Sequence, residues 1–141
     1  MKPKEIIIHC SATKEGHDYT VEDIDRWHKA RGFKSIGYHY VIYRDGTIVE
    51  GRPLNKQGAH CTGHNKDTIG ICYIGGLDYE GNPMDTRTIS QENAMINLVK
   101  ELLSKHPSIK NVSGHNKYAN KACPSFDVDD WMWRIGLTDW F

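Results

Sequence analysis

The chain has 141 residues, with 18 Lys and Arg against 18 Asp and Glu. This length suits one domain that buries an adequate core without cross-links. A net charge of zero argues against a broad nucleic-acid-binding surface, so no nucleic-acid partner is expected. A hydrophobic fraction of 38% with 26% charged residues is typical of a globular protein and excludes a disordered tail.

The sequence contains no pattern typical of a membrane span or a secretory signal. Its longest apolar runs, as at residues 6–8 and 38–43, are far shorter than the roughly 20 residues that cross a bilayer. The first residues lead directly into a strand-like run, so we expect synthesis in the cytoplasm without a signal peptide. The four cysteines should then be reduced, which favours metal binding or catalysis for any functional one.

Strands and helices alternate in the first half of the chain. Three consecutive isoleucines predict a buried strand over residues 5–9, because β-branched side chains favour extended backbone. Thr20 is a candidate N-cap with Asp23 as its capping-box partner, and Gly32 should end the helix that follows. Further strands are expected over residues 38–44, 47–50 and 68–74, the first two joined by a turn at Asp45-Gly46.

The second half predicts two more helices and one strand. Ser90 is the expected N-cap of a helix over residues 91–105. A short strand is expected over residues 109–114, and Asp127 should begin a last helix. Because the elements alternate but include a hairpin, the expected fold is α/β, with a central mixed β-sheet flanked by α-helices in one domain spanning residues 1–141.

The C-terminal segment is rich in tryptophan. Trp131 and Ile135 share one face of the last helix and should close the core. Trp133 and Trp140 either pack the terminal segment or form an exposed aromatic surface, and the sequence leaves both alternatives open.

Side chains that bind metals stand at the ends of three expected elements. His9 closes the first strand, His115 follows the strand over residues 109–114, and Cys123 lies in the next loop. Two imidazoles and a thiolate suit zinc better than magnesium or calcium, and a catalytic zinc site needs about three protein ligands. The spacing matches no compact metal motif, so His9 could instead bond a backbone carbonyl and Cys123 could be a small buried apolar residue.

Six short motifs occur in the order that is found in a known family. They are the segments Ile7–Thr13, Gly37–Tyr40, Tyr43–Thr47, Gly58–His60, Ile69–Ile71 and Lys121–Asp127. This series resembles the type-2 N-acetylmuramoyl-L-alanine amidases, most closely the small amidase, or lysozyme, of T-odd coliphages, and more distantly the peptidoglycan recognition proteins. No single motif is specific, but the combination extends over nearly the whole chain.

The resemblance implies a zinc-dependent hydrolase that cleaves the amide between the lactyl group of N-acetylmuramic acid and L-alanine in bacterial peptidoglycan. By the match of motifs, His9, His115 and Cys123 would bind Zn²⁺, and Tyr38 and Lys121 would be the catalytic pair. Tyr38 should orient water or relay a proton rather than act as a base, because its ordinary pKa is about 10. Lys121 should donate to the tetrahedral oxyanion.

The resemblance also implies how the substrate is reached and held. The expected partner is a muramyl-peptide, bound by a monomer that acts on the cell wall after its release. His60, in the Gly58–His60 motif, is a candidate substrate contact, and Asn65 in the same loop is another. Among the other thiols, Cys10 should be buried and point away from the metal, and Cys61 and Cys72 should be free.

A recognition domain that holds peptidoglycan without cutting it is the alternative. Such relatives lack the cysteine ligand, so Cys123 favours the enzyme, as do Tyr38 and Lys121.

Overall fold

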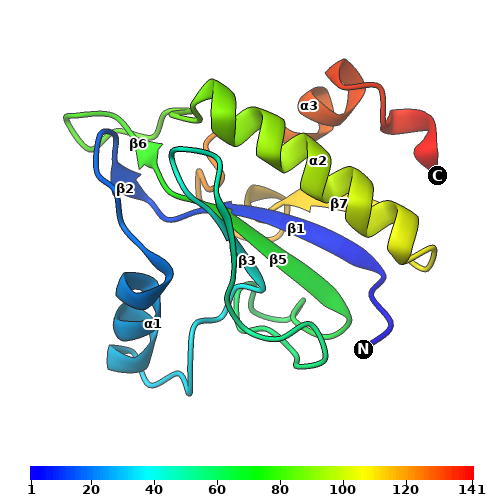
Figure 1. The fold of residues 1–141 in the computed structure, drawn as a ribbon, viewed down its shortest axis with the longest axis horizontal. Helices are drawn as coiled ribbons and strands as arrows, with labels where there is room; N and C mark the ends of the chain where they lie inside the picture. Colours follow the sequence, from blue (N-terminus) through cyan, green and yellow to red (C-terminus); the bar gives the residue numbers. More distant parts are fainter.

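The computed structural model describes residues 1–141 as one α/β domain around a five-stranded mixed sheet (Figure 1). The strand order is β4-β3-β5-β1-β7. The central strand β1 pairs in parallel with β5 and β7, β5 pairs in parallel with β3, and only the β3–β4 hairpin is antiparallel. The strands are β1 (Glu5–Cys10), β3 (Tyr40–Ile42), β4 (Ile48–Glu50), β5 (Thr68–Tyr73) and β7 (Asn111–Gly114). The predicted fold class is therefore confirmed.

Three α-helices flank this sheet. They are α1 (Val21–Ala30), α2 (Ile89–Lys105) and α3 (Val128–Arg134), with single 3-10 turns η1 (His115–Lys117) and η2 (Thr138–Trp140). Figure 1 shows α2 and α3 on one side of the sheet and α1 on the other. A second, two-stranded sheet joins β2 (Thr13–Lys14) to β6 (Gly76–Leu77) in parallel, and the sequence did not predict it.

The two faces of β1 serve different purposes. Ile6 and Ile8 belong to the large core cluster that α2 and α3 complete, together with Cys10. Successive side chains of a strand alternate between faces, so Ile7 and His9 point to the side of α1. Both are fully buried. The face away from α2 is therefore where the strand presents His9.

Helix capping agrees with the sequence at two of the three helices. Thr20 forms the predicted capping box of α1, and Asp127 accepts a hydrogen bond at the start of α3. The prediction for α2 is wrong, because Thr88 and not Ser90 is its N-cap. Thr88 exchanges hydrogen bonds with Gln91, whose side chain is fully buried and also donates to backbone oxygens at the ends of two strands. Ser90 is exposed and lies in the first turn of α2, two residues after the cap.

Some boundaries also differ from the prediction. The strand expected over residues 38–44 begins only at Tyr40, and the strand expected over residues 109–114 begins at Asn111. Trp131 is buried in the core, as predicted, with Ile135 packed against it. Trp133 is 71% exposed and Trp140 is 47% exposed, so both side chains lie at the surface. No helix is long and apolar enough to cross a membrane.

The capping assignment can be tested by denaturation. Thr88→Ala should lower the free energy of unfolding by about 1–2 kcal/mol, because it leaves the Gln91 N–H without its acceptor. Ser90→Ala should change the free energy by less than about 0.5 kcal/mol. Urea titrations of both variants give the two values. A larger loss in the Ser90 variant would contradict the assignment.

Candidate metal centre

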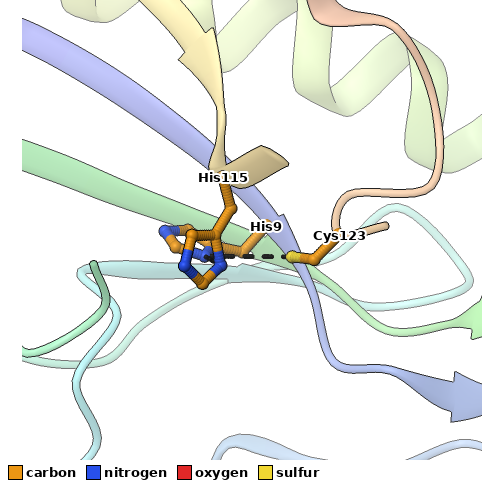
Figure 2. Close-up of side chains that lie close together, drawn as sticks. All are labelled: His9, His115 and Cys123. Carbon is orange, nitrogen blue, oxygen red and sulfur yellow. Dashed lines mark hydrogen bonds between the residues drawn. The ribbon is translucent and has the colours of Figure 1, made fainter. Parts of the chain in front are cut away.

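Two histidines and a cysteine meet at one edge of the sheet (Figure 2). His9 lies near the carboxyl end of β1, and His115 directly follows β7, the parallel neighbour of β1. The register pairs Ile8 with Gly114, so the residues that follow them, His9 and His115, lie next to each other. Cys123 reaches the same point from the loop before α3. The three ligand atoms all lie within 4.8 Å of one another.

These separations fit the donor set of a zinc ion. The Nδ1 atoms of His9 and His115 are 3.1 Å apart, and Cys123 Sγ is 4.0 Å from His9 Nδ1. Tetrahedral zinc with ordinary bond lengths needs about 3.3 Å between two nitrogens and about 3.6 Å between nitrogen and sulfur. Shifts of a few tenths of an ångström would satisfy both distances.

The neighbours of Cys123 determine whether its sulfur is a thiol or a thiolate. The backbone N–H of Cys10 donates to Sγ at 3.1 Å. Pairing with the Cys10 thiol and burial together raise the pKa of Cys123, so a thiolate at this position requires a neighbouring cation. Cys10 itself is buried, as predicted, and Cys61 and Cys72 are free.

The loop that carries Cys123 is anchored to the sheet on both sides of the sulfur. The Tyr73 hydroxyl donates to the Pro124 carbonyl oxygen at 2.7 Å. Ser125 Oγ donates to the Gly76 carbonyl oxygen at 2.8 Å. These bonds fix the loop against β5 and β6, so Cys123 is held toward the two histidines.

A third histidine lies behind His9. His60 Nδ1 is 2.8 Å from His9 Nε2, and His60 Nε2 is 3.1 Å from Thr68 Oγ1. Burial lowers the pKa of His9 and lowers the pKa of His60 to about 3, so both rings are neutral at physiological pH. Neutral imidazole is the form that binds metals. Sequence reasoning placed His60 in the cleft but missed this contact, for which no local pattern exists.

A cavity of about 280 Å³ opens at the candidate metal centre, where His115 is the one candidate ligand that lines it. Most residues predicted for the site line it: Tyr38, His60, Asn65, His115 and Lys121. The end of α1 and the turn after it add His28, Arg31 and Phe33, which sequence reasoning did not single out. Five of the seven predicted site residues thus surround one opening, and His9 and Cys123 lie next to it through His115.

Tyr38 lies in the segment before β3 and its ring centroid is 5.1 Å from that of His9. Burial raises the pKa of Tyr38, so the phenol is neutral and can donate a hydrogen bond. The segment is fixed at Gly37, whose N–H donates to His28 Nδ1. A Cβ at position 37 would lie 2.0 Å from the Ala59 carbonyl oxygen, so this close approach requires glycine.

Asn65 and Lys121 differ in how they are held. Asn65 Oδ1 accepts the backbone N–H groups of His60 and Cys61, each at 2.8 Å, and so shapes the wall of the cavity. Lys121 has an exposed side chain on the cavity rim. The predicted contacts of His60 and Asn65 with a substrate, and the catalytic roles of Tyr38 and Lys121, stay predictions.

The family model described as N-acetylmuramoyl-L-alanine amidase matches residues 1–126. The chain belongs to this amidase family. An endolysin of Enterobacteria phage K11 is 40% identical over 128 residues, which are 91% of this chain and 84% of that protein. The solved endolysin amidase LysCS from Clostridium intestinale superposes with a TM-score of 0.83 at 29% identity, over 97% of this chain and 86% of that one.

Recognition proteins are more distant relatives of this amidase. Peptidoglycan-recognition protein SC2 of Drosophila melanogaster is 31% identical over 123 residues, which are 85% of this chain and 64% of that protein. The resemblance to both groups that the motif series predicted is therefore confirmed. Because the chain belongs to an amidase family, the edge of the sheet where His9, His115 and Cys123 meet is its candidate catalytic centre.

Proposed function

We propose that this protein is a zinc-dependent N-acetylmuramoyl-L-alanine amidase that hydrolyses the bond between the lactyl group of N-acetylmuramic acid and L-alanine in peptidoglycan. The observation that carries the proposal is the convergence of His9, His115 and Cys123 beside a cavity lined by Tyr38 and Lys121. The relatives named as endolysins support a role in lysis of the cell wall. The protein would act there as a monomer after release from the cell.

Each residue of the site has a defined task in this reaction. Zinc held by the three ligands supplies Lewis acidity toward the amide carbonyl and toward water. The Cys10 N–H stabilises the thiolate of Cys123. Tyr38 orients water by donating a hydrogen bond, and the Lys121 ammonium donates to the oxyanion that forms on the amide. Donors that are already in place around the cavity can stabilise the developing charge without rearranging during the reaction.

The rival function is a recognition domain that binds muramyl-peptide without cutting it. A domain of that kind would need the cavity but neither the thiolate nor its N–H donor. The bond from Cys10 to Cys123 therefore favours catalysis. The two functions are separated by measuring new amino termini on purified cell walls, because only hydrolysis releases L-alanine-terminated peptides.

Removal of the metal should abolish hydrolysis. Dialysis against a strong chelator should stop peptide release from walls, and stoichiometric zinc should restore it. Cys123→Ser should weaken zinc binding, because it removes the thiolate, whereas Cys61→Ser should leave zinc content unchanged. Metal analysis and peptide release are the two measurements. Full activity in zinc-free protein would contradict zinc dependence.

Lys121 should contribute to the rate and not to metal binding. Lys121→Met should lower kcat on the order of 10²-fold, because it removes a donor to the oxyanion. Lys117→Met is a matched control, since Lys117 is also exposed and does not line this cavity. Steady-state rates on a soluble muramyl-peptide compare the two. An equal loss in both variants would point to general charge effects instead.

Tyr38 should act through its hydroxyl. Tyr38→Phe should reduce kcat on the order of 10²-fold with zinc content unchanged. Tyr40→Phe provides the control, because Tyr40 packs against the large core cluster of the α2 side. An unaltered kcat in the Tyr38 variant would remove the hydroxyl from the mechanism.

A further inference from the structure

The imidazole of His9 has one nitrogen for the metal centre and one for the protein interior. Its Nδ1 faces His115 Nδ1 at 3.1 Å and Cys123 Sγ at 4.0 Å. Its Nε2 faces His60 Nδ1 at 2.8 Å. A neutral imidazole carries only one proton, so the partner of Nε2 decides whether Nδ1 keeps a free lone pair.

The hydrogen-bond partners fix where the protons lie. The Thr68 hydroxyl has a single hydrogen, and the His64 carbonyl oxygen accepts it at 2.7 Å. Thr68 Oγ1 must therefore accept from His60 Nε2–H at 3.1 Å. His60 Nδ1 is then the unprotonated nitrogen, and the hydrogen in the 2.8 Å contact belongs to His9 Nε2. The chain of bonds ends on a backbone carbonyl, and no carboxylate takes part.

The ring of His60 cannot easily leave this position. A Cβ at Gly70 would lie 2.7 Å from His60 Cγ, and a Cβ at Gly58 would lie 2.6 Å from His60 Cδ2. Asn65 Oδ1 holds the backbone N–H of His60. Only 8% of His60 is exposed. Two glycines and one amide therefore make a fitted compartment for this imidazole.

We propose that His60, itself oriented by Thr68, is a positioning residue that holds His9 in the Nε2–H tautomer and so keeps Nδ1 available to the metal. This inference rests on the proposed function, in which His9 is a zinc ligand. Loss of the acceptor would leave His9 free to rotate or to carry its proton on Nδ1, and metal binding would then have to reverse that change. Such partners of metal-bound histidines typically alter metal affinity by about 10- to 100-fold.

Two substitutions at position 60 separate the hydrogen bond from mere packing. His60→Asn places an amide oxygen close to the position of Nδ1, so it can still accept from His9 Nε2–H. His60→Leu fills the compartment without an acceptor. Competition with a chromophoric chelator should show zinc affinity lowered roughly 10- to 100-fold in the Leu variant and largely retained in the Asn variant.

A second pair of variants tests the role of Thr68 with less disturbance. Thr68→Val keeps the shape of a fully buried side chain but removes the hydroxyl, and Thr68→Ser keeps the hydroxyl. Zinc affinity should fall in the Val variant, by less than in His60→Leu, and should stay near wild type in the Ser variant. Urea titrations of zinc-free protein show whether each variant folds.

Nitrogen-15 spectra of the histidine side chains provide a direct readout without activity. In zinc-free wild-type protein, His9 should be the Nε2–H tautomer and so should His60. An Nδ1–H tautomer of His9, or equal zinc affinity in His60→Leu and wild type, would overturn this inference alone. Absence of zinc binding by the wild-type protein would overturn the proposed function and with it this inference.

Discussion

The parallel pairing of β1 with β7 is the constraint on which the candidate site depends. His9 and His115 are 106 residues apart in the chain, and only the register of Ile8 opposite Gly114 brings them together. Because β5 occupies the other edge of β1, both edges of the central strand are paired and its register is fixed. A slip of one residue would move His9 to the face of α2 and place Ile8 at the candidate metal centre.

One face of β1 packs in the large core, and the other face carries the candidate metal ligand His9. Ile6, Ile8 and Cys10 contribute to the large core with α2 and α3, so this face holds the domain together. The opposite face carries His9, and α1 with its own small cluster covers only part of it. Cys10 links the two functions, because its side chain lies in the core and its N–H donates to Cys123. The candidate metal centre is thus attached to a fully buried strand that is paired on both edges.

Local chemistry predicts much of the fold, and pairing between distant segments explains what it leaves open at the site. Three isoleucines, the Thr20 capping box and the Asp127 cap were all readable from neighbouring residues. The cap at Ser90 is a misread local signal, because Thr88 and Gln91 have the spacing of a capping box. The buried Gln91 amide strengthens the cap at Thr88 by donating to the backbone oxygens of Ile42 and Ile74. For the site, residue types alone left the metal trio open, since its spacing is set by strand pairing. The motif resemblance named the trio, and no pattern indicated the contact between His9 and His60.

A neutral acceptor behind His9 has a consequence for the charge of the site. Two neutral imidazoles and one thiolate would leave a bound Zn²⁺ with one net positive charge, which favours a carbonyl oxygen or water in the open position. A carboxylate in the place of His60 would cancel that charge and would need its own compensation in a compartment that is 8% exposed. The bonds from His9 through His60 and Thr68 to the His64 carbonyl orient the ligand without adding a charge. With zinc bound as proposed, the site would combine a fixed ligand geometry with a positive centre, which is the combination that hydrolysis of a poorly electrophilic amide requires.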